Sequence, residues 1–331
     1  MSILVLGANG FLGLHVVRAL RDAGFGVRAG RRARSNVLAL RPLGVPMVEA
    51  DLDRPETLRA AMDGVRTVVH AAGHYPRLST DRAATLTRGA AQMTLALDAA
   101  AEAGVERFVH LSSTATVARV AGRPSTERDR FPRIPGFGVY HDLKWTMEAI
   151  AEAEDRLEVI TACPGACLGA WDLRIGTSAL LVALARGLKP RFPDGLVNLV
   201  DACDVADAVR ELVDRPCPPA RVLLSGSTWR LHALLTRLAP RYGVPPPGPP
   251  ISPSEAFRLA DREEARCARE GGRPALSREI ADLVVHGCAI DASTSRRALG
   301  LSYRPLHTTL DHFDEWARRM RFLPPRVAEH A

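Results

Sequence analysis

The sequence predicts an α/β fold in which a doubly wound parallel sheet is joined to a smaller, mainly helical C-terminal lobe. Two observations predict it. Short runs of four or five apolar residues alternate with amphipathic helical patterns through the first half of the chain, which is typical of strands buried on both faces of a parallel sheet. The first run leads directly into glycines at positions 7, 10 and 13. Repeated β-α units imply right-handed crossovers, and these wind the sheet on both sides.

The elements follow one another in a regular order. We expect these strands and helices: strands Ile3–Leu6, Gly26–Ala29, Met47–Glu49, Thr67–His70, Phe108–Leu111 and Val159–Ala162; helices Leu12–Ala23, Pro55–Met62, Ala90–Ala103, Tyr140–Ala153 and Thr177–Arg186. The pattern loosens after Gly169. There, residues 197–213 predict a short strand, a capping Asp201 and a helix, and 221–226 predict a further core strand.

These elements suggest how the chain is divided. We expect residues 1–169 to form the first domain, with residues 196–228 returning to it. Residues 170–195 and 229–323 would form the second lobe, and residues 324–331 a tail.

Composition excludes several classes of protein. The 331 residues are 47% hydrophobic, and 44 basic against 37 acidic residues give a mild net charge of +7, so we expect no nucleic-acid partner. No apolar run reaches the roughly 20 residues that span a bilayer, and no signal peptide precedes the first strand, so we expect a cytoplasmic protein without membrane contact. The six cysteines form no C-x-x-C pair and no H-E-x-x-H motif occurs, so we expect free thiols and no metal site.

The glycines at 7, 10 and 13 have distinct expected roles. Gly7 would permit a tight turn, Gly10 would let backbone amides approach a pyrophosphate, and Gly13 would let the helix pack close to the sheet. Backbone amides and the positive end of the helix favour phosphates. The alternative is a glycine-rich turn without a ligand. The order strand, loop and helix favours a dinucleotide site of the Rossmann type.

The residues after the second strand predict which dinucleotide is bound. Enzymes that use NAD usually carry Asp or Glu there, but this chain has Arg31 and Arg32. A guanidinium can grip a 2′-phosphate in a forked contact. We therefore expect NADP(H) rather than NAD(H), with Arg31 as the main contact and Arg32 or Ser35 assisting. A solvated basic turn is the alternative.

A pair of side chains on one helix predicts acid-base chemistry. Tyr140 and Lys144 are four residues apart and would share a helix face. A phenol with an ordinary pKa of about 10 becomes a usable proton donor and acceptor when a nearby ammonium lowers that pKa. Thr114 or Ser113, at the end of the fifth strand, would hold the same substrate oxygen by a hydrogen bond. Alone, such a pair is more often an interface ring and a solvated amine.

Two neighbours of the pair, His141 and Asp142, are expected to lie off the active face and in solvent. Cys163 and Cys167 are expected to be small buried filler rather than redox groups.

Five segments together carry a family resemblance. They are "GANGFLG" at 7–13, "SST" at 112–114, "YHDLK" at 140–144, "CPGACLG" at 163–169 and the tail at 289–319. Nearly the whole chain resembles an extended short-chain dehydrogenase/reductase, and its tail resembles the branch of dihydroflavonol 4-reductase, 3β-hydroxysteroid dehydrogenase and hopanoid-associated epimerase. By this resemblance Thr114 is the catalytic hydroxyl, Tyr140 is the acid/base, and Lys144 binds the nicotinamide ribose and tunes Tyr140.

The expected cofactor contacts come from the carboxyl ends of the strands. A carboxylate at Asp51 can accept from the adenine amino group, and the small residues after the fourth strand leave room for the cofactor. The full expected set is Gly7, Asn9, Gly10, Phe11, Leu12, Gly13, Arg31, Arg32, Ser35, Asp51, Leu52, Ala71, Ala72, Gly73, Ser112, Tyr140, Lys144, Pro164, Gly165 and Cys167.

Departures from the family pattern bear on the substrate. Sugar-nucleotide members often carry Arg before the proline at 164 and Asn two residues after it, where this chain has Cys163 and Ala166; they tend to have Tyr at the place of Leu168. Dehydratase members carry Asp-Glu where Ala115-Thr116 stand. These differences favour a reductase that acts on a less polar carbonyl or alcohol.

The leading hypothesis is an NADP(H)-dependent oxidoreductase that interconverts a ketone and a secondary alcohol on a hydrophobic small molecule. The alternatives are an epimerase of a nucleotide sugar with tightly bound NAD, and a catalytically silent protein that senses NADP(H). Expected to line the substrate pocket are His74, Tyr75, Trp171, Thr177 and Asn198, although each could instead cap a loop or fill the core. The alanine-rich helices at 90–103 and 140–153 would permit the close packing of a homodimer, as in many members of the family.

Overall fold

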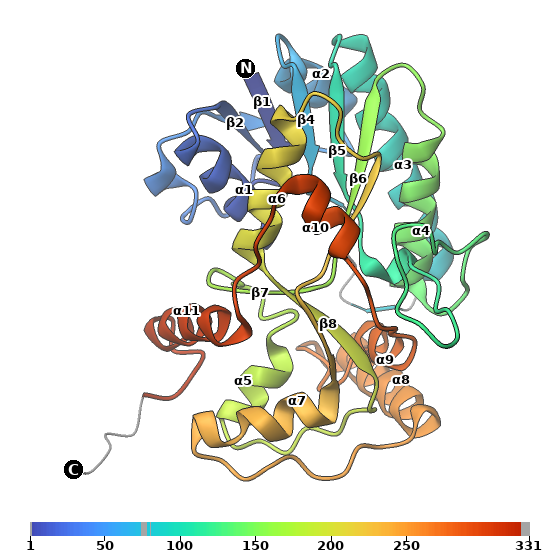
Figure 1. Cartoon of the computed structure of the whole chain (residues 1–331), viewed down its shortest axis with the longest axis vertical. Coiled ribbons are helices and arrows are strands. Elements are labelled where there is room, and N and C mark those ends of the chain that lie inside the picture. The colour runs from blue at the N-terminus through green and yellow to red at the C-terminus, as the bar shows by residue number, and fades with distance from the viewer. Residues whose placement is uncertain (1, 74–77, 80, 326–331) are drawn as a thin grey trace.

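A seven-stranded parallel sheet forms the upper half of the molecule (Figure 1). The computed structural model describes residues 2–73, 78, 79 and 81–325. The strands lie in the order β3-β2-β1-β4-β5-β6-β9, all parallel. Their bounds are β1 Ser2–Leu6, β2 Gly26–Arg31, β3 Met47–Glu49, β4 Thr67–His70, β5 Arg107–Leu111, β6 Glu158–Pro164 and β9 Arg221–Leu224. This is the Rossmann strand order, and the order reverses between β1 and β4.

Helices cover both faces of the sheet. Helices α1 (Phe11–Asp22) and α6 (Ala202–Asp214) pack together on one face. Helices α2 (Pro55–Met62), α3 (Arg82–Glu102) and α4 (Val139–Glu152) cover the other. Successive strand residues supply the two cores in turn, because side chains alternate across a strand: Ile3 and Val5 of β1 face α1, and Leu4 and Leu6 face the opposite helices. The predicted doubly wound α/β sheet is confirmed.

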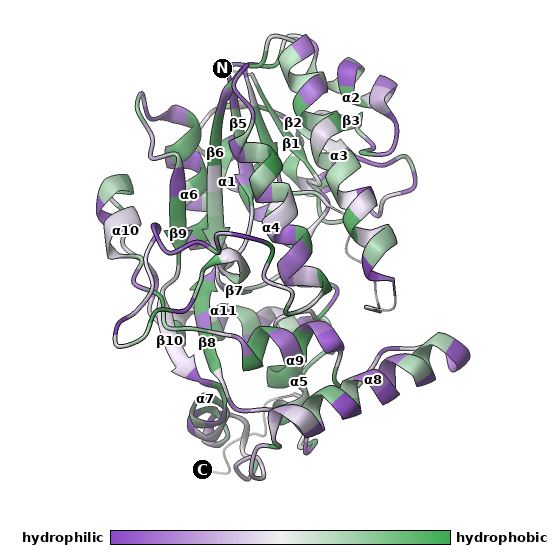
Figure 2. Ribbon diagram, turned by 90° about the vertical axis from the view of Figure 1, so that its right-hand side faces the viewer, coloured by the Kyte–Doolittle hydropathy of each residue, from purple (hydrophilic) through white to green (hydrophobic). Residues whose placement is uncertain are grey.

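The lower half contains a small sheet and most of the remaining helices. Strands β10 (Ser227–Arg230), β8 (Leu196–Asp201) and β7 (Ala166–Leu168) pair in that order. The helices of this half are α5 Ala179–Ala185, α7 Leu231–Leu238, α8 Pro253–Glu270, α9 Arg278–Val285 and α11 Leu306–Arg319, whereas α10 Ser293–Leu299 packs against α6 and β9 of the large sheet. A separate hydrophobic core, which includes Phe192, Phe313 and Trp316, holds much of this half together. In Figure 2 the central strands of the large sheet are mostly hydrophobic, whereas β10 is not and α8 carries many hydrophilic residues.

The structure differs from the predicted elements in three places. Helix α3 begins at Arg82 rather than Ala90, because its first turns carry exposed polar residues and are capped by Asp81, whose carboxylate accepts from the Ala84 amide. The short strands β7 and β10 were not predicted, since three or four residues give no usable periodicity. Residues 196–228 divide between the two sheets: β9 joins the large sheet, and β8 joins the small one.

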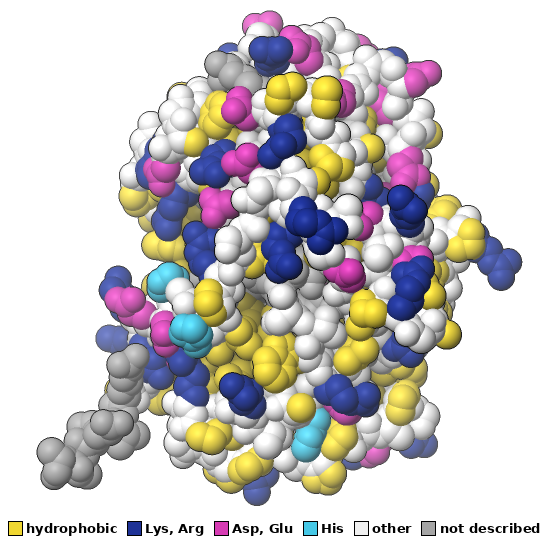
Figure 3. Space-filling model, in the orientation of Figure 1, with side chains coloured by type: hydrophobic (Ala, Val, Ile, Leu, Met, Phe, Trp, Pro, Cys, Tyr) yellow, Lys and Arg dark blue, Asp and Glu magenta, His cyan; other side chains and the backbone are white. Residues whose placement is uncertain are grey.

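Charges of both signs are interspersed over the face drawn in Figure 3. Within the described part of the chain, no helix is both long and apolar enough to cross a membrane. The same residues contain no group of three or more His, Cys, Asp or Glu side chains that could hold a metal ion.

Candidate active site

The loop after β1 is built from close backbone approaches. Gly7 has a φ of 75°, and a Cβ there would lie 2.8 Å from the Ala71 carbonyl oxygen. A Cβ at Gly13 would lie 2.2 Å from the Gly7 carbonyl oxygen. Helix α1 begins immediately after Gly10, so the amides of its first turn, at Phe11, Leu12 and Gly13, have no acceptor inside the helix. The loop therefore exposes backbone amides, and at Gly7 and Gly13 there is no room for a side chain larger than hydrogen.

Arg31 is the last residue of β2, and its guanidinium lies along the loop that follows. Its Nη1 donates to the carbonyl oxygens of Arg32 (3.2 Å) and Ala33 (2.9 Å). Its Nε is buried without a hydrogen-bond partner among the described residues. Arg32 is exposed and Ser35 is half-buried, and the Ser35 amide donates to the Arg32 carbonyl oxygen to close the turn.

Asp51 follows β3 at the same edge of the sheet. It is half-buried; its Oδ1 accepts from the Asp53 amide and its own amide donates to the Thr57 hydroxyl. Leu52 is buried. After β4 the half-buried residues 71–73 run beneath the glycine loop, where the Ala71 amide donates to Leu6. The structure thus gathers the predicted adenosine and phosphate contacts along one edge of the large sheet.

The hydroxyl cluster after β5 is divided among different tasks. The Ser112 hydroxyl donates to Glu148 at 2.7 Å. The Ser113 Oγ accepts from the Ala115 amide and caps a 3₁₀ turn, η2, over Thr114–Thr116. Thr114, at the start of this turn, is half-buried, and η2 packs against helix α4. Of the three hydroxyls, those of Ser112 and Ser113 therefore have structural hydrogen bonds.

Tyr140 and Lys144 lie one turn apart in α4. Tyr140 is in the first turn of the helix and is half-buried. Lys144 is only 2% exposed, and its ammonium donates to the Leu111 carbonyl oxygen at 2.9 Å. An ammonium so well buried is held at the carboxyl end of β5 by a fixed acceptor. The Lys144 amine consequently lies at the carboxyl edge of the sheet, the edge at which β1 leads into the glycine loop.

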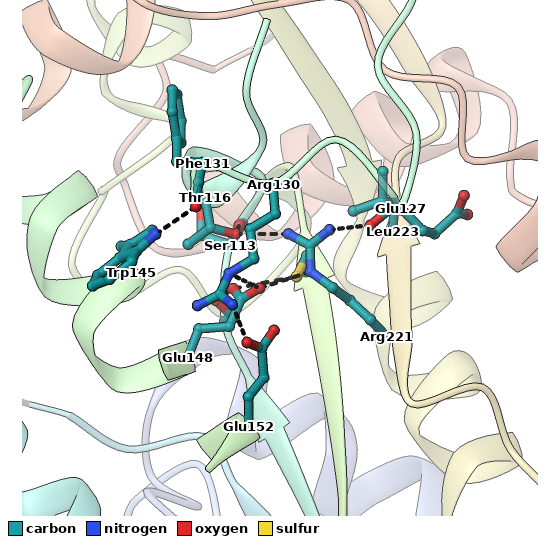
Figure 4. Close-up of polar contacts among 12 residues, drawn as sticks. Ser113, Thr116, Glu127, Arg130, Phe131, Trp145, Glu148, Glu152, Arg221 and Leu223 are labelled. Atoms are coloured by element: carbon teal, nitrogen blue, oxygen red, sulfur yellow. Dashed lines mark hydrogen bonds and ion pairs between the residues drawn. The ribbon is translucent and has the colours of Figure 1, made fainter. Parts of the chain in front are cut away.

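A buried ion network fixes α4 and η2 to the sheet (Figure 4). Glu148 of α4 is fully buried and accepts from the Arg221 Nε of β9 at 2.7 Å. Arg221 also donates to the Thr116 hydroxyl and to the Glu127 carbonyl oxygen. Arg130 lies 3.4 Å from Glu148 across a second ion pair. One carboxylate thereby ties together the helix with the phenol, the turn with Thr114 and strand β9.

Two expectations about α4 are wrong. His141 and Asp142 were expected in solvent, but they are 3% and 0% exposed. The Asp142 carboxylate accepts from the Gly136 amide and pairs with Arg82 at 2.8 Å. The His141 ring packs edge-on against Phe137, and burial lowers its pKa to about 4. The reason is that Arg82 of α3, the 131–138 loop and His286 pack over these two side chains.

The segment after β6 lies between the two halves. Pro164 ends β6 and is buried, and a Cβ at Gly165 would lie 2.4 Å from the Asn198 carbonyl oxygen. Cys163 and Cys167 are buried, and burial raises the pKa of each thiol to about 12. A thiol with such a pKa is not a thiolate at neutral pH, so both behave as compact filler.

The three predicted substrate residues that the structure describes have different surroundings. Trp171 joins the cores of the two halves, with Arg18 of α1 over its ring at 5.9 Å. Thr177 is exposed. Asn198 is buried in β8, and its amide donates to Cys288 and accepts from Thr228. His74 and Tyr75 lie outside the described residues.

Sequence reasoning missed the residues that helix α9 places at the beginning of α4. His286 stacks on Phe137 with ring centroids 4.0 Å apart, and Phe257 of α8 lies beyond it at 6.3 Å. Glu279 of α9 is near enough to Lys144 of α4 for the two charges to interact. Helices α8 and α9 carry no motif that would mark these side chains. A buried pair, His70 and His110, with Nδ1 atoms 3.1 Å apart, was missed for the same reason.

Comparison with known proteins agrees with this geometry. The family model described as "NAD dependent epimerase/dehydratase family" matches residues 3–215. The chain is 30% identical over 307 residues to sterol demethylase protein B of Methylococcus capsulatus, covering 91% of this chain and 93% of the relative. It is 29% identical over 265 residues to dihydroflavonol 4-reductase of Zea mays, covering 73% and 74%.

A solved structure described as a nucleoside-diphosphate-sugar epimerase from Pseudomonas aeruginosa superposes with a TM-score of 0.80 at 25% identity, over 98% of this chain and 99% of that one. The family model covers more than half of the chain, and the fold agrees over nearly its whole length. The chain therefore belongs to the NAD-dependent epimerase/dehydratase family and is an NAD(P)-dependent enzyme of the extended short-chain dehydrogenase/reductase type.

Proposed function

We propose that this protein is an NADP(H)-dependent oxidoreductase that interconverts a ketone and a secondary alcohol on a hydrophobic small molecule. One observation carries the proposal: Lys144 is buried and held by the Leu111 carbonyl oxygen one helical turn from Tyr140, while the turn of Thr114 packs against the same helix. Burying an ammonium is costly, so its retention at this edge is best explained by a chemical task.

The residues present fit a dinucleotide. Gly7 and Gly13 leave room that a Cβ would fill, and the first amides of α1 point their unpaired N–H groups away from the helix. Lys144 would hold the nicotinamide ribose. The hydride itself comes from the bound nicotinamide cofactor.

The proton is transferred by side chains of the protein itself. The positive charge of Lys144 favours the phenolate form of Tyr140 and so lowers the barrier to proton transfer. In reduction, the Tyr140 hydroxyl gives its proton to the carbonyl oxygen of the substrate and becomes a phenolate; in oxidation, the phenolate takes the hydroxyl proton of the alcohol. Thr114 holds the same oxygen through a hydrogen bond and stabilises the charge that develops on it.

Arg31 is the reason to propose NADP(H). It ends β2, where NAD enzymes of this fold place an acidic residue. Its buried Nε has no hydrogen-bond partner among the described residues, which leaves donor capacity for a phosphate.

The proposed substrate is hydrophobic. The names of the two relatives, a dihydroflavonol 4-reductase and a sterol demethylase protein, point to fused-ring molecules of low charge. The rings of Phe137, His286 and Phe257 give the site an apolar side that suits such a molecule.

The test is a titration of the purified protein with NADPH and NADH, followed by turnover of a panel of cyclic ketones and alcohols. We expect tighter binding of NADPH and its oxidation by at least one ketone. Protein that carries tightly bound NAD and consumes no NADPH would instead support an epimerase, the activity named for the Pseudomonas structure. Binding of NADPH without turnover of any ketone or alcohol would support a sensing role.

A further inference from the structure

One face of helix α9 is turned toward the beginning of α4. Residues 279, 282 and 286 recur at intervals of three and four, so they share a face. The Asp282 carboxylate lies against Gly138, where a Cβ would be 2.1 Å from its Oδ2. His286 stacks on Phe137. Two of the three positions thus contact the segment that leads into Tyr140.

Glu279 is the third position on this face, and its surroundings differ from those of its acidic neighbours. The Glu264 carboxylate of α8 accepts from the Ser79 amide at 2.7 Å and from the Arg278 amide at 2.8 Å. The Asp282 carboxylate accepts from the Arg278 guanidinium. The Glu279 carboxyl has no hydrogen bond or ion pair with any other residue that the structure describes.

The charges around Glu279 come from three helices: Glu264 on α8, Asp282 on α9 and Lys144 on α4. Burial raises the pKa of the Glu279 carboxyl to about 7, the two carboxylates act in the same direction, and Lys144 opposes them. A half-buried carboxyl with no donor is an unfavourable arrangement unless a donor arrives with a ligand.

We propose that Glu279 is a substrate-binding residue that accepts a hydrogen bond from a hydroxyl or amine carried by the substrate. This inference rests on the proposed function, since it places the donor on the molecule that Tyr140 reduces. An anionic group such as a diphosphate would meet the Glu279 and Glu264 carboxyls here, neither of which forms an ion pair with a described residue, and would be repelled. The site would therefore select neutral or cationic ring ketones that bear a donor.

The experiment compares ketones that differ in the donor alone. The probes are the 5-, 6- and 7-hydroxy derivatives of 1-tetralone, the corresponding methoxy derivatives, and the corresponding aminomethyl derivatives. Binding to the protein saturated with NADPH is measured by calorimetry, and turnover is followed by NADPH oxidation. The variants are Glu279→Gln and, as a matched control on the exposed end of α8, Glu270→Gln.

We expect a donor-bearing ketone to bind about 10- to 100-fold tighter than its methoxy counterpart, as is ordinary for a hydrogen bond to a charged group. Glu279→Gln should abolish most of this preference by raising the KM of the donor-bearing ketone, and it should leave the KM of the methoxy ketone unchanged. The control variant Glu270→Gln should keep the preference. The hydroxyl and aminomethyl arms tell which donor is used. A merely structural role for Glu279 would change both classes of ketone equally.

Equal affinity for donor and methoxy ketones, or a preference that persists in Glu279→Gln, would overturn the inference. So would the absence of donor-dependent binding up to about 1 mM, the upper range of ordinary KM values. If donors bind with the expected preference but no ketone oxidises NADPH, then Glu279 binds as inferred and it is the proposed oxidoreductase activity that fails.

Discussion

The carboxyl edge of the large sheet and the α8–α9 face of the lower half present different kinds of chemical groups. At the sheet edge, the groups belong to the backbone: Gly7 and Gly13 are packed so closely that a Cβ would lie within 3 Å of a carbonyl oxygen. At the α8–α9 face, the groups are side chains, the Glu279 carboxyl and the rings of His286 and Phe257.

This difference explains why the glycine loop is easy to identify from the sequence and the side chains of the α8–α9 face are not. A backbone that must approach a phosphate requires glycine at fixed positions, and these stand out in a sequence. A carboxyl or ring on a helix is one of many, and nothing local distinguishes it. The difference teaches that a glycine loop can be identified from its sequence, whereas the side chains of the α8–α9 face are identified only in the folded chain.

The strongest test addresses the point where the two regions meet. Tyr140→Phe should lower kcat by about 10²- to 10⁴-fold, the usual contribution of a general acid or base, while NADPH binding is kept. Stopped-flow turnover and fluorescence titration measure the two effects. Tyr303→Phe is the matched control, because the Tyr303 hydroxyl is buried without a partner among the described residues. Full activity in Tyr140→Phe would remove the proposed role.

The second test removes the buried charge that holds α4 and η2 against the large sheet. Glu148→Gln leaves Arg221 and Arg130 without their shared buried anion, so the free energy of unfolding should fall by about 3–5 kcal/mol. Urea denaturation measures it. Glu152→Gln is the control: the Glu152 side chain is 43% exposed, and its pair with Arg130 should contribute about 1 kcal/mol or less. Equal losses in the two variants would show that the network is not anchored on Glu148.

A third test asks whether the cofactor side depends on the backbone. Gly13→Ala introduces a Cβ 2.2 Å from the Gly7 carbonyl oxygen, so α1 must shift, and NADPH affinity should fall about 10- to 100-fold. Gly248→Ala has nothing within 4 Å of the new Cβ and should bind NADPH as the parent does. If Gly13→Ala bound equally well, the loop would not be a phosphate cradle.

The smallest expected effect concerns the choice of dinucleotide. Arg31→Ala should weaken the binding of NADPH by about tenfold, because a hydrogen bond to a charged group is lost. The binding of NADH should be unaffected, and titration of each dinucleotide measures both affinities. The exposed Arg34 supplies the control, Arg34→Ala. Equal weakening of both dinucleotides would mean that Arg31 supports the loop rather than the 2′-phosphate.

Much of the fold followed from local pattern. The strands at 3–6, 47–49 and 67–70 lie where the apolar runs predicted them, and the parallel order follows from the β-α alternation. The start of α3 and the short strands β7 and β10 did not follow, because neither is marked by apolar periodicity. Within the site, Lys144 was found from its spacing to Tyr140, whereas Glu148 and Arg221 lie 73 residues apart and only β9 brings them together.

What the sequence alone determined is the nucleotide half: glycines whose missing Cβ is required, and a Tyr and a Lys whose four-residue spacing places them on one helix face. The tertiary structure alone decided that Asp142 and His141 are buried, that the Ser112 hydroxyl donates to Glu148, and that Glu279 is near enough to Lys144 for their charges to interact. The physical reason is the distance along the chain over which the relevant interactions act. Turns and helix faces are set by residues a few positions apart, but burial and electrostatic environment are set by whichever distant segment packs across them.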